Sequence, residues 1–313
     1  MMVRFLAIWF ALSALGTIAH PVGVDTADDL VQTPGGLIPK SNTHLVPEGA
    51  KIIHTPTLVQ LVRADGTVLH STPVATSGQV SPLRNISGTP TSAARRALHS
   101  GWTAYSFWSP SSGPEISYFE TTWTVPPAPT LWSGQLVYIF NGLEPSTTLA
   151  ILQPVLQYGY SEAGGGIYWS IASWYVIGTT AYYTSAIEVQ PGQTLRGVLD
   201  NSGTTTSGGI LSSYMWYSYF EIDNVLNSNT LLILNTVDIL HWACETLEIY
   251  TTTTASNLPA GTLAMSGIEI YTGNSQPSAL NWLLTNDAAD SIYIELVSTS
   301  SSNGELEIVF PIA

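Results

Sequence analysis

The feature that most constrains this chain is a series of short β-type runs that fills residues 101–313. These runs are rich in β-branched and aromatic residues and are separated by turn formers, and no segment shows a convincing helical period. Strands of this kind bury their apolar faces by stacking two sheets. The pattern therefore predicts an all-β fold, a two-sheet antiparallel β-sandwich. The expected strands are ISYFETTWTVP, QLVYIFNGL, LAILQPVLQYG, IYWSIASWYVIG, TAYYTSAIEV, TLRGVLD, SYMWYSYFEI, TLLILNTVDIL, WACETLEIY, LAMSGIEIYTG, DSIYIELVS and LEIVF.

Two further segments precede the expected sandwich domain. Residues 1–19 place Arg4 ahead of an apolar stretch and end in small residues, which is typical of a signal peptide and too short for a membrane span. Residues 20–100 hold most of the Lys and Arg residues and several prolines, and LVQLVRADGTVLH has a hairpin pattern. We expect this segment to be a propeptide-like N-terminal extension that is either cleaved at Arg95-Arg96 or retained.

The charge pattern limits the partners and the environment of the protein. Only 10% of the residues are charged, the net charge is -14, and Arg196 is the only basic residue after Arg96. Such a surface repels phosphate backbones and anionic headgroups, which argues against nucleic-acid or membrane binding. We expect a secreted, extracellular monomer that works in an acidic medium. Cys244 is the sole cysteine, so packing rather than disulfides must stabilise the fold.

Two amides lie inside the apolar run AILQPVLQYG: Gln153 and Gln157. An amide buried without a partner costs about 1 to 3 kcal/mol. Either these side chains satisfy backbone groups of the sheet, or Gln153 has a function.

An ordered set of motifs resembles the eqolisins, the fungal glutamic peptidases. The motifs are GWTAYSFWSP, ISYFETTWTVPPAP, VYIFNGLEP, AILQ, an aromatic strand ending in Trp174-Tyr175, and EVQPGQTLRG. The resemblance implies a concanavalin A-like jelly-roll sandwich and a secreted acid endopeptidase without metal or other cofactor. It also implies a catalytic glutamine and glutamate on neighbouring strands, with Gln153 as the glutamine. In such a dyad the carboxylate takes a proton from water while the amide stabilises the oxyanion.

The matching glutamate is displaced in this sequence. An ungapped match to WACETLEIY puts Cys244 at the catalytic position and Glu248 at the family's second glutamate. Side chains alternate along a strand, so Glu245 can face Gln153 only through a β-bulge, whereas Glu248 shares the face of Cys244 about 13 Å away. Both glutamates therefore remain candidates. The chain also has Asn141 and Ser173 where the family carries acids.

Candidate substrate-binding residues lie around this pair. Tyr168, Trp169 and Trp174 belong to the strand after the glutamine strand and are candidates for a groove that stacks on a peptide or sugar, together with Asn141. His241 lacks a visible set of further metal ligands, so we expect a structural role and no metal site.

Two functions follow as alternatives. The first is a secreted acid endopeptidase of the glutamic type, which acts on a polypeptide through Gln153 and either Glu245 or Glu248. The second is a catalytically inactive sandwich that binds peptide or carbohydrate in an aromatic groove. A glycosidase fits less well, because no ExDxxE-like strand is present.

Overall fold

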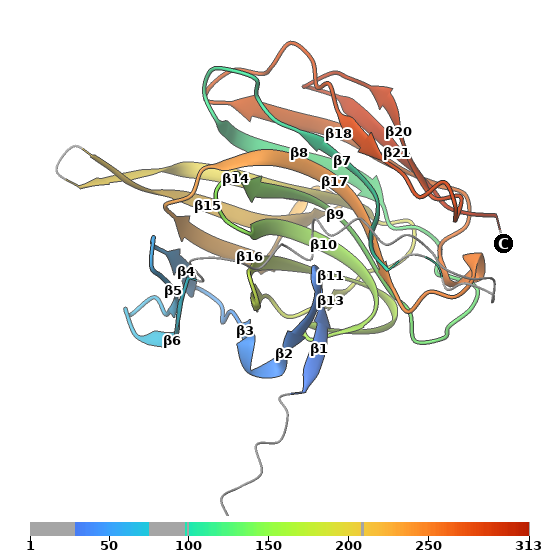
Figure 1. Cartoon of the computed structure of the whole chain (residues 1–313), viewed down its shortest axis with the longest axis horizontal. Helices are drawn as coiled ribbons and strands as arrows, with labels where there is room; N and C mark the ends of the chain where they lie inside the picture. Colours follow the sequence, from blue (N-terminus) through green and yellow to red (C-terminus); the bar gives the residue numbers. More distant parts are fainter. Residues whose placement is uncertain (1–28, 75–97, 99, 208–209, 313) are drawn as a thin grey trace, which may run out of the picture.

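The computed structural model describes residues 29–74, 98, 100–207 and 210–312, and these form two stacked β-sheets (Figure 1). The predicted all-β, two-sheet sandwich is confirmed, and each expected run after residue 100 contributes to a strand. The expected signal peptide and the Arg95-Arg96 pair lie outside the described residues. Within the described ranges, no helix is long and apolar enough to cross a bilayer.

The first sheet has nine strands and carries the candidate glutamine. Its strands run in the order β19, β7, β17, β9, β10, β11, β12, β3, with β13 also paired to β11. Their bounds are Leu283–Thr285 for β19, Gly101–Trp108 for β7, Leu240–Tyr250 for β17, Leu136–Pro145 for β9, Ala150–Ser161 for β10, Gly164–Ile177 for β11, Thr180–Tyr183 for β12, Thr43–Leu45 for β3 and Ile187–Glu188 for β13.

The second sheet has ten strands, in the order β20, β21, β18, β8, β14, β15, β16, β4, β5, β6. Their bounds are Tyr293–Ser298 for β20, Gly304–Val309 for β21, Thr262–Thr272 for β18, Ile116–Thr124 for β8, Thr194–Ser207 for β14, Ile210–Ile222 for β15, Val225–Thr236 for β16, Lys51–His54 for β4, Leu58–Val62 for β5 and Val68–Pro73 for β6. β5 and β6 form the hairpin expected from LVQLVRADGTVLH.

The main hydrophobic core lies between the two sheets. Side chains alternate across a strand, so one half of each central strand points into this core. On β9, Val137 and Ile139 pack with Phe119 and Trp123 of the opposite sheet. The other half of β9 points to the outer face of the nine-stranded sheet, where Phe140 belongs to a separate buried cluster.

The N-terminal segment is paired into both sheets. β3 pairs with β12 and β4 pairs with β16, and these are the two parallel pairings in the described sheets. A two-stranded hairpin, β1 (Leu30–Thr33) and β2 (Gly36–Pro39), precedes them. Its Ile38 is buried in the outer cluster of the nine-stranded sheet. Residues 29–74 are thus paired with, or packed on, the sandwich.

Candidate functional site

Gln153 lies in a row of side chains that crosses the outer face of the nine-stranded sheet. On β10 it pairs with Trp174 of β11, and it follows the Leu152–Leu143 pair with β9, which sets it beside Gly142. Gly142 in turn pairs with Cys244 of β17. At about 4.8 Å per strand, the Gln153 and Cys244 backbones are about 10 Å apart. We call this surface, defined by Gln153, Gly142, Cys244 and Trp174, the Gln153 face.

This row is buried and closely packed. Gln153 is 1% exposed and Cys244 is fully buried. A Cβ added to Gly142 would lie 2.9 Å from Ile151 Cδ1 and 3.1 Å from Cys244 Sγ, so these two side chains fill the space above the glycine. No donor among the described residues reaches Gln153 Oε1. The amide therefore has an acceptor available, but it lies among apolar neighbours.

Gln157 has the structural role that Gln153 lacks. Its Nε2 donates to the carbonyl oxygen of Gly164 at 2.9 Å, and its Oε1 accepts from Ser161 Oγ at 2.9 Å. These bonds tie the end of the β10–β11 hairpin. Of the two amides in AILQPVLQYG, only Gln153 is left with an unsatisfied oxygen within the described structure.

Glu245 points away from Gln153, into the interior between the sheets. It is fully buried, pairs with Asn141 of β9, and accepts a hydrogen bond from Thr121 Oγ1 of the opposite sheet. Burial raises the pKa of this carboxyl well above its ordinary value, against the smaller effect of the Thr121 hydrogen bond. Asn141 shares this interior face, where its Nδ2 donates to the carbonyl oxygen of Gly197 at 3.1 Å. The pairing of β17 with β9 contains no bulge at Glu245 that re-aims it.

Glu248 lies on the same face as Cys244 but farther along β17. Its carboxylate accepts hydrogen bonds from the Tyr250 hydroxyl and from the Gly35 amide, the latter at 2.7 Å. Burial raises its pKa to about 7, although both hydrogen bonds act in the opposite direction. It lies four residues beyond Cys244, about 13 Å along the strand. Glu248 therefore holds the N-terminal hairpin and does not reach Gln153.

The three aromatic candidates occupy different environments. Trp174 is buried on the Gln153 face, and its ring centroid lies 5.0 Å from that of Tyr183. Trp169 is buried in the core between the sheets, where it contacts Tyr158. Tyr168 is 39% exposed near the β10–β11 turn. Trp174 alone lies beside Gln153.

Glu144 is the carboxylate near this row that the sequence reasoning missed. It lies on β9 two residues beyond Gly142 and pairs with Trp242, so it shares the Gln153 face. Burial raises the pKa of the Cys244 thiol well above its ordinary value, and the charge of Glu144 raises it further. The available signal was strand alternation in NGLEP, which puts Gly142 and Glu144 on one side.

The chemistry open to this arrangement follows from these positions. An amide N–H can donate to an oxyanion, but the unsatisfied atom of Gln153 is its oxygen, and the residue across Gly142 is a thiol. A buried thiol with a raised pKa is a poor nucleophile. His241 Nδ1 is 2.7 Å from Glu115 Oε2, as a structural histidine would be. Among the described residues, no cluster of three or more His, Cys, Asp or Glu side chains is placed to hold a metal.

Comparison with known proteins finds a distant structural likeness. No protein-family model and no curated protein match the chain. Among solved structures, two of scytalidoglutamic peptidase, one with a peptide-based transition-state analogue and one with a transition-state analogue inhibitor, are similar at TM-scores of 0.41 and 0.42, with 11% and 12% identity. SCP-B, a member of the eqolisin family of peptidases in complex with the tripeptide Ala-Ile-His, is similar at a TM-score of 0.40 and 11% identity. Each likeness covers 68% of this chain and 98% of the other, and none assigns a role to a residue.

Proposed function

We propose that this chain is a secreted, eqolisin-like β-sandwich that holds an extended polypeptide on its Gln153 face and does not cut it with a glutamine/glutamate dyad. The observation that carries the proposal is the row formed by Gln153, Gly142 and Cys244, in which a thiol stands where a dyad needs a carboxylate.

A segment of the chain itself already lies on the same outer surface of the nine-stranded sheet, where its hydrogen bonds are to the Glu248 end of that surface. Ile38 of the β1–β2 hairpin is 4% exposed and packs in the same buried cluster as Trp174 and Cys244. The Gly35 amide donates to Glu248, and the Gln32 carbonyl oxygen accepts from the Glu162 amide at 3.4 Å. Apolar side chains and backbone groups thus share the contacts, as in the recognition of extended peptides.

These contacts favour polypeptide over carbohydrate as the ligand. The hairpin contributes backbone amide and carbonyl groups and an apolar side chain, which any extended peptide can supply. Trp174, the aromatic side chain beside Gln153, is fully buried against Tyr183 and presents no free ring for stacking on a sugar.

The binding proposal is tested by loosening the hairpin. Ile38→Asp places a charge in the buried outer cluster that includes Trp174 and Cys244 and should open this cluster to a ligand, whereas Leu37→Asp changes the neighbouring residue, which is 61% exposed. We expect the Ile38 variant to bind reduced, denatured casein in a pull-down or by interferometry, and the wild type and the Leu37 variant to bind weakly. Equal binding by all three proteins would contradict the proposal.

The absence of dyad hydrolysis has its own test. Incubation of the wild type with denatured casein at about pH 3 to 4, where a carboxyl of ordinary pKa near 4.3 is more than half protonated, should leave the substrate intact. Cys244→Glu introduces a carboxyl opposite Gln153. Its control is Cys244→Gln, whose side chain has the same size but carries no carboxyl. Fragments produced by the wild type and lost in Gln153→Ala would overturn the proposal.

A second candidate, the acid endopeptidase, is favoured by one observation. Glu144 brings a carboxylate onto the Gln153 face, close enough for its charge to raise the pKa of Cys244. If the wild type cleaves casein, Glu144→Gln should abolish cleavage if this residue is the base, whereas Glu248→Gln should do so if the more distant carboxyl is used. If both variants still cleave casein, the endopeptidase candidate is ruled out.

A further inference from the structure

The β1–β2 hairpin turns in front of Glu248 with a distinct backbone geometry. Its register pairs Thr33 with Gly36, so Pro34 and Gly35 form a two-residue loop. Proline fixes its own φ at about -65°, and Gly35 has a φ of 98°. Among the common turns, type II combines a negative φ at the first loop residue with a positive φ at the second. The hairpin therefore presents a Thr-Pro-Gly-Gly turn of type II to the sheet.

This turn leaves one backbone donor for the sheet. The amide of Gly35 lies inside the loop and donates to Glu248 Oε1 at 2.7 Å. A type II turn splays the strands of a two-residue hairpin, and such hairpins favour the primed turn types instead. The less favoured turn indicates that the contact with Glu248 helps to hold this conformation.

Glu248 is a buried acceptor that the hairpin satisfies only in part. Its side chain is fully buried, and the Tyr250 hydroxyl is its second donor. Within the described structure, no group donates to Glu248 Oε2. Burying a carboxyl without complete hydrogen bonding is costly, and burial raises the pKa of Glu248 to about 7. The built-in turn leaves part of this cost uncompensated, which allows another turn to replace it.

The row of side chains through Glu248 runs parallel to the row through Gln153. Glu248 pairs with Tyr138 of β9, and Tyr138 pairs with Gln157 of β10. Each of these three residues lies four positions from its counterpart in the Gln153 row, about 13 Å along the strands. About four extended residues span that distance. One polypeptide can therefore place a turn at Glu248 and extend an arm toward Gln153.

We propose that the Glu248 end of this surface is a recognition site for a turn of the sequence Xaa-Pro-Gly-Gly, which a polypeptide partner supplies in place of the β1–β2 hairpin. The inference rests on the proposed function, because it names the kind of polypeptide that the surface holds. Two requirements give selectivity. The third turn residue must offer a free amide to Glu248, and the third and fourth must adopt a positive φ. Gly35 and Gly36, with φ of 98° and 112°, meet both.

Backbone conformation, rather than space, requires glycine at the fourth position. Among the described residues, the atom nearest to a Cβ added at Gly36 is Tyr250 Oη, at 3.8 Å, which is an ordinary van der Waals contact. An L-alanine would therefore fit but would be strained by the positive φ. A D-alanine adopts a positive φ readily. The two alanines separate a conformational requirement from a steric one.

The test measures peptide binding to the full chain by fluorescence anisotropy. The receptor carries Gly35→Ala and Gly36→Ala, which strain the built-in turn and free the site. The probes are the labelled peptide LVQTPGGLIP, residues 30–39, and two relatives with L-alanine or D-alanine in place of its second glycine. We expect the glycine and D-alanine peptides to bind and the L-alanine peptide to bind at least about tenfold more weakly. The wild-type chain, whose own turn occupies the site, should bind each peptide weakly.

Variants of this receptor locate the peptide. Glu248→Leu removes the acceptor and should lower the affinity at least about tenfold, whereas Glu248→Gln keeps a carbonyl acceptor and should retain most of the affinity. Glu188→Leu, the same change at an exposed carboxylate on β13 of the same sheet, should have no effect. Unfolding curves check that each receptor folds. The comparison of the L-alanine and D-alanine peptides decides the matter if Glu248→Leu does not fold.

Three results would overturn the turn site: no binding of the glycine peptide, equal binding of the glycine and L-alanine peptides, or an equal loss in Glu188→Leu and Glu248→Leu. Equally tight binding by the wild-type chain would also overturn it. Casein binding by Ile38→Asp would then still support a surface that holds polypeptide, so the two proposals fail separately. Loss of both kinds of binding would overturn both.

Discussion

Gln153 and Cys244 lie in one row on the same face of the nine-stranded sheet, with only Gly142 between them. The glycine leaves room that the side chains of Ile151 and Cys244 fill. The geometry of the row therefore depends on the absence of a side chain at position 142.

Gly142→Ala is expected to destabilise the protein by about 1 to 3 kcal/mol, because the new Cβ overpacks a closed site. It would lie 2.9 Å from Ile151 Cδ1 and 3.1 Å from Cys244 Sγ. Urea unfolding measures the change in the free energy of unfolding. Cys244→Ala in the same background removes one of the two clashes, so the double variant should lose less than the two single losses added together. Strict additivity would show that the two residues do not touch.

Cys244 is expected to be chemically inert in the folded protein. Burial, and then the charge of Glu144, raise the pKa of its thiol well above the ordinary value, and a thiol reacts as the thiolate. A chromogenic thiol reagent at pH 8 should therefore modify no cysteine in the native protein and one per chain in denaturant. Because Cys244 is the sole cysteine, the stoichiometry reports on it alone. Rapid native labelling would show that the row opens to solvent.

Glu245→Gln is expected to stabilise the protein at neutral pH. Burial raises the folded-state pKa of Glu245 above its unfolded value of 4.5, so the folded chain keeps a proton that the unfolded chain releases. The stability that this carboxyl contributes is fully present below pH 4.5 and is lost as pH rises toward the folded pKa. Glutamine resembles the protonated acid and can still accept from Thr121 Oγ1.

Urea unfolding of this variant at pH 4 and pH 7 provides the measurement. We expect near-equal stability of wild type and variant at pH 4, and a gain of about 1 to 3 kcal/mol for the variant at pH 7. Glu48→Gln, at an exposed position, serves as the control and should show no such gain. A variant that is less stable by the same amount at both pH values would refute the assignment of a protonated Glu245.

Acid is expected to loosen the N-terminal strand β3. His44 of β3 stacks on His70 of β6, with ring centroids 3.5 Å apart, and this contact joins the two sheets. Burial lowers the pKa of both, that of His44 to about 4, where the charge of His70 contributes as well. When β3 detaches, His44 takes up its proton near pH 6.5. The attachment of β3 to the sandwich therefore weakens as pH falls from about 6.5 to about 4.

Hydrogen exchange of the β3 amides, corrected for intrinsic rates, measures this effect. Protection should fall by about an order of magnitude between pH 6.5 and pH 4. His70→Phe should reduce this pH dependence, whereas His241→Gln, outside the stacked pair, should not alter it. Equal protection at both pH values in the wild type would contradict the prediction.

The sandwich, and the face of the sheet to which each β17 side chain points, were predictable because both follow from the two-residue period of a strand. Alternation alone places Cys244 and Glu248 on one face and Glu245 on the other, and the structure has this arrangement. The same rule separates Trp169 from Trp174, which are five residues apart. Treating both as groove residues overlooked that alternation, since Trp169 is in the core between the sheets.

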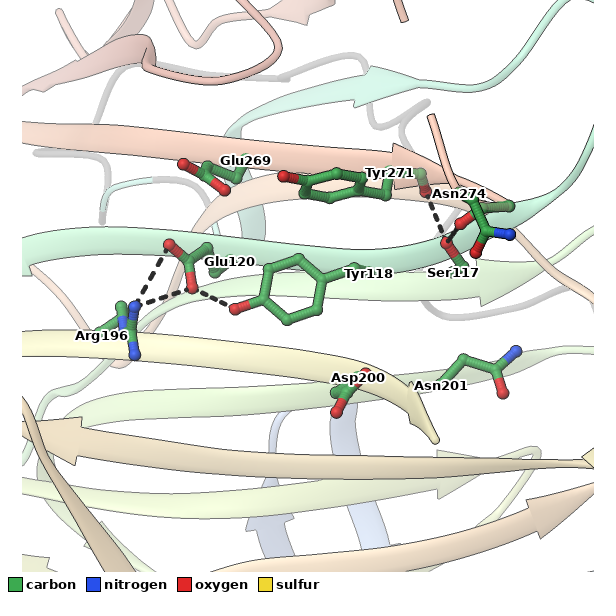
Figure 2. A pocket seen from close by; sticks show the side chains of 10 residues that line it. Ser117, Tyr118, Glu120, Arg196, Asp200, Asn201, Glu269, Tyr271 and Asn274 are labelled. Atoms are coloured by element: carbon green, nitrogen blue, oxygen red, sulfur yellow. Dashed lines mark hydrogen bonds and ion pairs between the residues drawn. The ribbon is translucent and has the colours of Figure 1, made fainter. Parts of the chain in front are cut away.

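The features that the sequence did not predict depend on contacts between residues far apart in the chain. The position of Glu144 relative to Gln153 depends on the register between β9 and β10, which no local pattern encodes. The parallel pairings of β3 and β4 join segments more than a hundred residues apart. The pocket around Arg196 (Figure 2) likewise draws on three strands, β8, β14 and β18, and its one sequence signal is the isolation of Arg196 in an acidic domain.

The pairing of the N-terminal strands has a consequence for solubility. β3 covers the edge of β12, and β4 with β5 and β6 covers that of β16. In a shortened chain without residues 29–74, the open edge of the first sheet would move from β3 to β12, and that of the second sheet from the six-residue β6 to the twelve-residue β16. Long open edges recruit strands from neighbouring molecules. Residues 29–74 thus protect the protein against self-association. Concentrated solutions of the shortened chain should form oligomers that the full chain does not.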